Sequence, residues 1–250
     1  MLDADITFAV AIAALFVAGS VKGLVGMGLP TTALGILTLT IDPRTAIALI
    51  LFPMLITNAW QMISSGHILR TVRRYWPFSS VLVLGVGATA YLTASAPDAF
   101  LLTALALVIL LFVGLSWTDR IPELPDRFDS FSQVTAGAFG GVIGGLTAAW
   151  ASPIGVYLTA KRVDKDEFVR ASGFLIFLGS IPIFWAYAHL GLFSGPMATT
   201  SAIMIVPAML GLSLGTMMRK RLNGDAFKNA VLVVFVLLAL NLLRRAYWPL

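Results

Sequence analysis

The chain has 250 residues, of which 58% are hydrophobic and 12% are charged, and its mean hydropathy is +0.91. A soluble domain carries about 25% charged residues, so this composition excludes a cytosolic enzyme, a nucleic-acid-binding module and a disordered tail. With no cysteine and two histidines, the chain offers no disulfide, no thiolate chemistry and no ordinary zinc site. We expect residues 1–250 to form a single polytopic membrane domain of net charge +5, without a cleavable signal peptide.

The first apolar segment, Ile6–Thr40, is too long for one membrane crossing and too short for two, because one crossing needs about 20 residues. Glycines and a proline interrupt it between Gly19 and Pro30. Non-helical backbone at membrane depth is tolerated only inside protein or beside a watery cavity, so we predict a buried, broken helix. The pattern leaves one alternative open, which is tight packing of glycine faces between unbroken helices.

A second interrupted segment lies in the other half of the chain. Ser132–Ala160 carries a glycine run from Gly137 to Gly145, followed by Ser152 and Pro153, and we predict a second broken helix there. Six other stretches have the length and composition of ordinary spans: Thr45–Ser64, Pro77–Ser95, Ala99–Trp117, Ala171–Leu190, Met197–Met217 and Lys228–Leu243. The predicted fold is an all-α polytopic membrane protein of about 8–10 helical segments.

The two halves of the chain repeat one another. Matching residues are Gly19, Gly23 and Gly26 with Gly137, Gly141 and Gly144, and Phe52, Trp60 and Gly66 with Phe177, Trp185 and Gly191. The match covers a broken segment and the span after it in each half. We therefore predict a first repeat at 1–117, a cytoplasmic connecting loop at 118–131 and a second repeat at 132–250.

The basic residues indicate how the repeats are oriented, because cytoplasmic loops are enriched in Lys and Arg. Loops near Arg70, Lys161 and Arg219 are rich in basic residues, whereas the matching loop of the other repeat holds at most one in each case. This alternation predicts two inverted repeats, provided that each broken segment is a re-entrant hairpin entering and leaving on the same side. Arg244 and Arg245, at a C-terminus predicted to lie outside, fit this scheme only if they snorkel to the interface.

The interior of the predicted spans holds no carboxylate, because all twelve acidic residues fall in predicted termini or loops. Cation transporters and proton relays usually need such carboxylates, so their absence argues against cation transport. Lys22 is the charged residue inside a broken segment. A buried ammonium is costly unless it is paired, and with no acid available we expect a negatively charged substrate as its partner. The alternative is that Lys22 snorkels to an interface.

The rest of the predicted anion site lies at the two breaks. Half-helices that begin near Pro30 and Pro153 would direct free N–H groups and positive dipole ends at the midplane. Asn58 and Gln61 share one helical face, where they either line a pathway or bond between helices. No catalytic or metal-binding residue is predicted. The predicted substrate-binding residues are Lys22, Gly23, Gly26, Gly28, Pro30, Thr31, Thr32, Asn58, Gln61, Gly141, Gly144, Gly145, Ser152 and Pro153.

Other polar and aromatic residues are expected to serve the structure. His67 and His189 fall near span ends, and the membrane aromatics are more often packing residues or interface anchors than site residues. The chain contains no G-x-x-x-x-G-K-[ST] phosphate loop and no evident Ser-His-Asp arrangement. We therefore expect no enzymatic activity and no ATP drive within this chain.

The glycine-rich segments also carry a resemblance to a known family. The run V-x-G-x-x-x-G-L-x-G-x-G-x-P from Val17 to Pro30 resembles that of the TauE/SafE sulfite exporter (TSUP) family. The second segment, from Gly137 to Pro153, and the two-half layout extend the resemblance over the whole chain. The resemblance implies a bacterial inner-membrane transporter of sulfite, sulfoacetate or other organosulfonates, usually outward and coupled to the proton gradient.

We therefore expect a multi-pass secondary transporter in the cell inner membrane that exports small sulfur-containing oxyanions by alternating access. The alternatives are a permease for another small anion such as a carboxylate, a carrier of a neutral metabolite, and a non-transporting membrane assembly subunit. The expected partners are the small anion, sulfite or an organosulfonate, and the lipid bilayer. A homodimer is left open, and neither a nucleic-acid partner nor a cofactor is expected.

Overall fold

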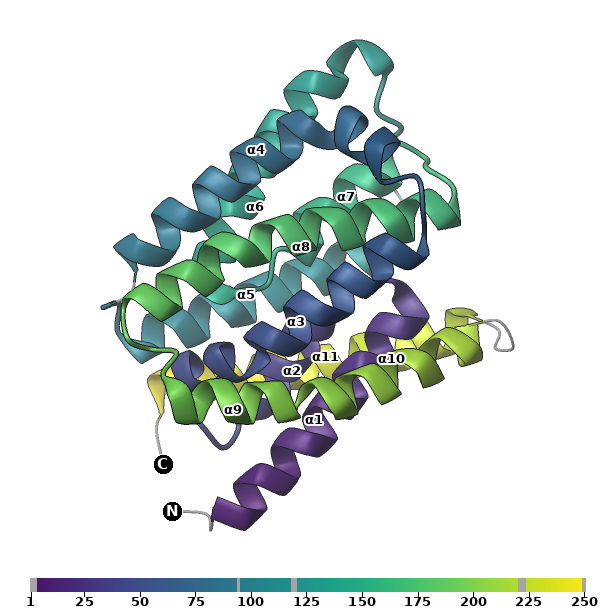
Figure 1. Cartoon of the computed structure of the whole chain (residues 1–250). Helices are drawn as coiled ribbons and strands as arrows, with labels where there is room; N and C mark the ends of the chain where they lie inside the picture. Colours follow the sequence, from purple (N-terminus) through teal and green to yellow (C-terminus); the bar gives the residue numbers. More distant parts are fainter. Residues whose placement is uncertain (1–3, 94, 118–120, 220–223, 249–250) are drawn as a thin grey trace.

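The computed structural model describes residues 4–93, 95–117, 121–219 and 224–248 of the chain (Figure 1). Over these ranges the chain forms eleven α-helices, one short 3-10 helix and no strand. This confirms the predicted all-α class and exceeds the predicted 8–10 helical segments. The first half contains α1 (Ala4–Val25), α2 (Leu29–Leu37), α3 (Pro43–Ser64), α4 (Ile68–Leu92) and α5 (Asp98–Trp117). The second half contains η1 (Asp126–Phe128), α6 (Asp129–Thr147), α7 (Ala151–Ala160), α8 (Lys165–His189), α9 (Gly195–Ile203), α10 (Ile205–Arg219) and α11 (Gly224–Tyr247).

Length and surface character both place these helices in a lipid bilayer. Among the described residues, five stretches are long and apolar enough to cross a membrane: Thr7–Val25, Pro43–Ser64, Ile68–Leu92, Lys165–His189 and Gly195–Arg219. Large apolar side chains also lie on the outside of the molecule, with Leu84, Leu210 and Leu237 each at least 60% exposed. Exposed apolar surface of this extent is unfavourable in water, so it indicates contact with lipid.

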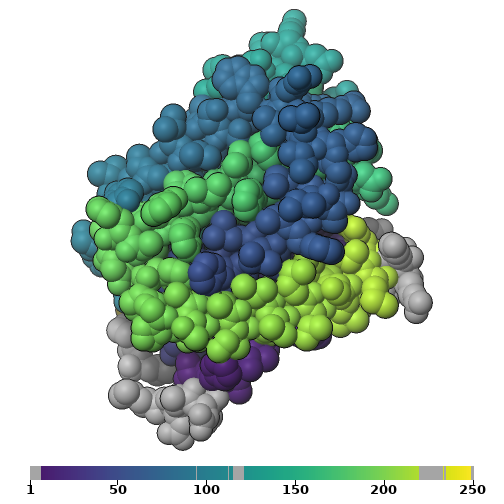
Figure 2. All heavy atoms as spheres, in the orientation of Figure 1, coloured from purple at the N-terminus to yellow at the C-terminus, as the bar shows by residue number. Residues whose placement is uncertain are grey.

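The helices pack as two flanking pairs around a central pair. α4 lies beside α6 on one flank and α1 lies beside α10 on the other, while α3 and α8 pack together between them (Figure 1). α5 packs against α11. In the sphere view, α8, α3 and the α9–α10 pair form adjacent bands across the visible face (Figure 2). Helices from the two halves are thus interleaved throughout the bundle.

The first broken segment is interrupted only at Gly26–Gly28. α1 continues through Gly19 and Gly23, so the expectation that the interruption begins at Gly19 is wrong. A Cβ atom at Gly19 would lie 2.2 Å from the carbonyl oxygen of Ala208, which means that this glycine allows α1 and α10 to approach closely. Gly26 and Gly28 have φ values of +92° and +103°, which side chains disfavour, and there the helix ends.

The second broken segment follows the same plan. α6 continues through Gly137, Gly141 and Gly145, and the break falls later, at Ala148–Trp150. A Cβ atom at Gly141 would lie 2.8 Å from the Cα atom of Gly85, so these glycines bring α6 close to α4. The glycine-packing alternative is therefore correct for the glycines within α1 and α6. The two expected breaks are present, but each is shorter than the interrupted segment that the sequence predicted.

The glycines of α1 and α6 pack against α10 and α4, and these two partner helices are also interrupted at corresponding places. Within α4, Tyr75 has non-helical backbone angles (φ −109°, ψ 15°), two residues before Pro77. In the second half, α9 and α10 separate at Met204, three residues before Pro207. Since proline removes a backbone donor and clashes with the preceding turn, it explains both interruptions. Each half therefore contributes one long helical segment with a proline-linked interruption, which is a kink in α4.

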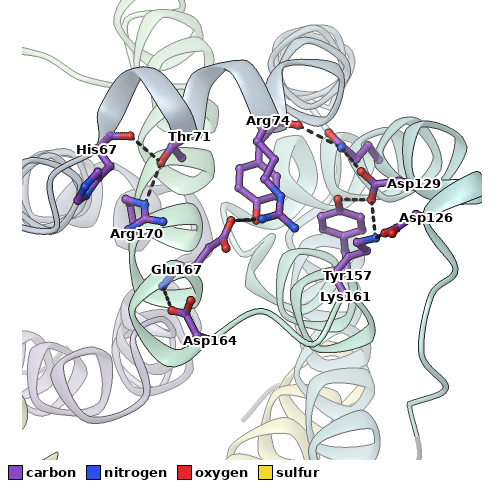
Figure 3. Close-up of polar contacts among 12 residues, drawn as sticks. His67, Thr71, Arg74, Asp126, Asp129, Tyr157, Lys161, Asp164, Glu167 and Arg170 are labelled. Atoms are coloured by element: carbon purple, nitrogen blue, oxygen red, sulfur yellow. Dashed lines mark hydrogen bonds and ion pairs between the residues drawn. The ribbon is translucent and has the colours of Figure 1, made fainter.

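Most of the basic residues gather at one end of the bundle, which we call the basic end, whereas Arg44 at the start of α3 and Arg244 and Arg245 in the last turn of α11 lie at the other end. At the basic end the start of α4 meets the start of α8, and the end of α7 meets the start of α6 (Figure 3). Arg70, Arg73 and Arg74 lie in the first turns of α4 and not in a loop, and α8 already begins at Lys165. The side chain of Asp164 accepts a bond from the Glu167 N–H at 2.7 Å, a cap that starts α8 before its apolar part. The predicted basic residues Arg120, Lys220 and Arg221 lie outside the described residues.

Several acidic residues are also placed differently from the expectation, because Asp98, Asp129, Asp166 and Glu167 each lie in the first turn of a helix. Glu167 lies in the first turn of α8, and the residue is only 9% exposed. Its Oε1 atom accepts hydrogen bonds from Arg74 at 2.7 Å and from the Tyr75 hydroxyl at 2.8 Å (Figure 3). The prediction that every acidic residue lies in a terminus or loop is therefore wrong for these residues, and Glu167 is the one that an ion pair and a tyrosine hydroxyl hold nearly buried.

Candidate functional site

A cavity of about 600 Å³ opens at the basic end between α1, α3, α8 and α10. It exists because α1 ends at Val25 and because glycine and serine, rather than larger residues, line much of its wall. Along α10 the lining runs from Leu212 to Arg219, which corresponds to a depth of about 10 Å at 1.5 Å per residue. The lining residues are Lys22, Gly23, Gly26, Trp60, Gln61, Ser64, Ser65, His67, Asp166, Val169, Arg170, Leu212, Ser213, Thr216 and Arg219.

Lys22 lies at the inner part of this cavity. The residue is 1% exposed, which contradicts the alternative that its ammonium snorkels to an interface. Its Nζ atom donates to Oδ1 of Asn58 at 2.5 Å, and the Asn58 amide nitrogen donates in turn to the Met54 carbonyl at 2.7 Å. None of the ion pairs found among the described residues involves Lys22. An ammonium has three N–H donors, so the neutral Asn58 satisfies one of them and leaves the charge without an acidic partner.

Gln61 holds the end of α1 against α8. Its Nε2 atom donates to the carbonyl oxygens of Gly26 at 2.8 Å and Val169 at 2.5 Å. The Ser172 hydroxyl lies 3.3 Å from the same Gly26 carbonyl oxygen. The Gly26 carbonyl directly follows the end of α1, so it has no partner within the helix. Gln61 therefore bonds between helices, as one of the two alternatives expected, while also lining the cavity.

The charges around the cavity favour an anion. Three cationic side chains, Lys22, Arg170 and Arg219, line it together with one carboxylate, Asp166. The Nε atom of Arg170 donates to the Thr71 hydroxyl at 3.0 Å, so this guanidinium is held in place from α4 (Figure 3). An arginine that is held in position loses little conformational freedom when it binds an oxyanion.

The end of α7 is fastened to the connecting segment by further polar contacts. Lys161 bonds Asp126 at 2.5 Å and lies 3.6 Å from Asp129, and the Tyr157 hydroxyl donates to Asp129 at 2.7 Å (Figure 3). The hydrogen bond from Lys161 holds the pKa of the exposed Asp126 carboxyl below its usual range. These contacts join the beginning of α6 to the end of α7, at the same end of the bundle as the cavity.

The structure brings only part of the predicted site together. Lys22, Gly23, Gly26 and Gln61 line the cavity, and Asn58 lies directly behind Lys22. The remaining predicted residues are not among its lining: Gly28, Pro30, Thr31, Thr32, Gly141, Gly144, Gly145, Ser152 and Pro153. Their substrate-binding role stays a prediction.

Local contacts explain the positions of several of these residues. The Thr32 hydroxyl donates to the Gly28 carbonyl at 2.8 Å, so its hydrogen is used within its own helix. Gly144 packs against the Trp150 ring. Pro153 lines a second, largely apolar cavity of about 430 Å³ between α5, α6 and α7. As predicted, α2 and α7 begin close to Pro30 and Pro153, so their first turns lie next to the two breaks.

Among the cavity residues that were not predicted as binding residues, four have titratable side chains: Arg170, Arg219, Asp166 and His67. His67 was expected to serve the structure near a span end. The other three were attributed to loops, because hydropathy cannot distinguish a loop from the polar first or last turn of a helix. The signal that could have found them is their spacing. Asp166 and Arg170 are four residues apart and therefore share one face of the beginning of α8.

The comparisons with known proteins agree with this picture. A protein-family model described as sulfite exporter TauE/SafE matches residues 11–242 of the chain. No curated protein and no solved structure matches. The family match covers all the residues that line the cavity, from Lys22 to Arg219.

Proposed function

The chain belongs to the sulfite exporter TauE/SafE family of multi-pass inner-membrane transporters, and we propose that it exports small sulfur-containing oxyanions such as sulfite or organosulfonates. The observation that carries this proposal is the environment of Lys22. A buried ammonium faces a cavity and contacts a neutral amide instead of a carboxylate. A buried charge without a counterion is costly, and a bound anion supplies the missing counterion during each transport cycle.

The proposed topology is that of two inverted repeats, each with a re-entrant hairpin. The 3.6 Å contact between Lys161 and Asp129 supports it, because α6 begins and α7 ends at the same end of the bundle. The packing between the two halves supports this topology as well, because the first helix of each half packs against a helix of the other half. Gly23 of α1 meets Gly215 of α10, and the matching Gly141 of α6 meets Gly85 of α4. Such a relation between equivalent helices is expected when two copies of one unit insert in opposite directions.

Transport is proposed to proceed by alternating access. The cavity opens at the basic end, which the distribution of Lys and Arg assigns to the cytoplasm, so this conformation corresponds to an inward-facing state. The interruptions at Tyr75 and Met204 lie next to the prolines of α4 and α10. Because each proline already lacks the backbone donor of one helical hydrogen bond, one part of the helix can move relative to the other without breaking that bond. For proton coupling, sulfite titrates near neutrality and is proposed to carry its own proton.

The test is efflux from proteoliposomes containing the purified chain. Labelled sulfite is loaded, and sulfoacetate, acetate and a neutral solute are supplied in turn as competitors. We expect sulfite efflux that sulfur oxyanions suppress most strongly. Suppression by acetate above that of sulfoacetate would favour a carboxylate permease, suppression by the neutral solute would favour a metabolite carrier, and absence of any flux would favour an assembly subunit.

A further inference from the structure

The mouth of the cavity contains a second group of charged residues, apart from Lys22. Arg170 on α8 and Arg219 at the end of α10 both line the cavity, together with His67 at the start of α4. Leu212, which packs against Gly23, and Arg219 are about 10 Å apart along α10. The backbone of Arg219 therefore lies nearer the mouth than the part of α10 that meets Gly23, and Arg170 lies in the second turn of α8, close to the same end.

The geometry of Arg170 suits it to hold an anion. Its Nε atom is occupied by the Thr71 hydroxyl, and the terminal guanidinium nitrogens have no partner among the residues that the structure describes (Figure 3). Although Asp166 lies four residues before it on the same face, no ion pair between them is found in that part of the chain. The guanidinium is thus fixed at one nitrogen and available at the others, an arrangement that favours a planar or tetrahedral oxyanion.

Two other basic residues at this end are paired with carboxylates. Arg74, the nearest basic residue toward α6, is bonded to Glu167 at 2.7 Å, and Lys161 is bonded to Asp126 and lies close to Asp129 (Figure 3). These cations are compensated by carboxylates, whereas no ion pair of Arg170 or Arg219 is found among the described residues. The cavity mouth therefore carries positive charge that can raise the local concentration of anions.

From these observations we propose that Arg170 and Arg219 form a capture site for small oxyanions at the cytoplasmic mouth, distinct from the Lys22 site and occupied before it. The capture site favours divalent over monovalent anions, because the Coulomb energy of each arginine with the ligand scales with the ligand's charge. Asp166 opposes it and limits how tightly the anion is held, which permits onward movement to Lys22. This inference rests on the proposed export of oxyanions.

The test compares KM and maximal rate of sulfite efflux for Arg170→Gln and Arg219→Gln at low ionic strength. We expect each to raise KM about threefold or more at an unchanged maximal rate, with the effect fading at high salt. Inhibition by thiosulfate, a dianion, should weaken more than inhibition by methanesulfonate, a monoanion. Asp166→Asn should shift KM in the opposite direction, which a merely structural role would not produce.

Two control variants each remove one positive charge at the basic end from a residue that does not line the cavity. Lys165 and Arg73 are exposed cations at the basic end that do not line the cavity, so Lys165→Gln and Arg73→Gln should leave KM near the wild-type value. Arg170→Lys keeps the charge but loses the guanidinium that bonds Thr71, so its KM should lie between those of the wild type and Arg170→Gln. Unchanged melting temperatures of the variants guard against loss by misfolding. Equal shifts in the cavity and control variants, or no shift in any, would overturn the capture site while leaving sulfite export intact. A wild-type protein without sulfite flux would overturn the proposed function itself.

Discussion

At the scale of single residues, the pair formed by Lys22 and Asn58 decides the charge of the cavity. Their side chains meet at 2.5 Å, and both residues are almost completely buried. The amide orients the ammonium without neutralising it. If it were a carboxylate, the pair would form an internal salt bridge, and the ammonium would no longer need a counterion from outside.

Asn58→Asp tests this view directly. The new carboxylate would occupy the position of the Asn58 oxygen beside Lys22 and act in place of the substrate, so we expect sulfite binding to be lost while the protein stays folded. The measurement is the increase of melting temperature on addition of sulfite, since a ligand that binds the folded state raises its apparent stability.

The matched control is Asn241→Asp. Asn241 accepts a bond from Arg244 at 3.0 Å on α11 and is not part of the cavity lining, so the same chemical change there should leave the response to sulfite unaltered. If Asn58→Asp responds to sulfite like this control, an uncompensated charge at Lys22 is not what binds the anion.

The sequence was sufficient to single out Lys22, Asn58 and Gln61 as polar residues within apolar segments, and the structure places them in or directly beside the cavity. Their role in substrate binding stays a prediction. The sequence was not sufficient to identify Arg170. That residue lies in a polar helix start, and its position on the cavity depends on the bond to Thr71, which is distant in the sequence. The hydroxyl residues near the breaks had the right composition for an anion site, yet Thr32 bonds to its own helix.

At the scale of helices, the glycines of α1 and α6 act mainly in packing. The sequence predicted both interrupted segments and the glycine repeat between them. The location of each break could not be read from the sequence, because a glycine in a close helix contact and a glycine in a helix break have the same pattern. The distinction depends on the partner helix, and at Gly23 a Cβ atom would lie 2.3 Å from the Leu212 carbonyl oxygen.

Substitution of these glycines by alanine should therefore destabilise the bundle. We expect Gly23→Ala and Gly141→Ala to lower the melting temperature, because the new methyl groups would collide with the backbone of α10 and α4 and force the helices apart. Gly114→Ala on α5 is the control, since no atom lies within 4 Å of the Cβ position there and alanine favours a helix by about 1 kcal/mol. A melting temperature that falls equally in all three variants would contradict the packing role.

At the scale of the whole molecule, the basic end and its cavity are proposed to face the cytoplasm. The absence of cysteine from the sequence allows single-cysteine variants to report on this orientation without interference. Ser213 lines the cavity, whereas Ser194 is exposed at the start of α9, in the turn that follows α8 at the opposite end.

We expect Ser213→Cys to react with a membrane-impermeant thiol reagent only from the cytoplasmic side, and Ser194→Cys only from the outside. Sulfite should slow the labelling of Ser213→Cys, because the anion occupies the same cavity. Intact cells and inverted membrane vesicles give the two sides. Reactivity of Ser213→Cys from outside, with Ser194→Cys protected there, would show that the topology is reversed.

The central claim is that the ammonium of Lys22 is the counterion for the transported anion. Isothermal titration of sulfite into the purified protein tests it most directly, with Lys22→Met as the variant, because methionine has similar length and no charge. We expect Lys22→Met to bind sulfite about tenfold more weakly than the wild type or worse, a loss of about 1.4 kcal/mol, while its melting temperature without ligand does not fall. Equal sulfite affinity in the two proteins would show that Lys22 is not the counterion.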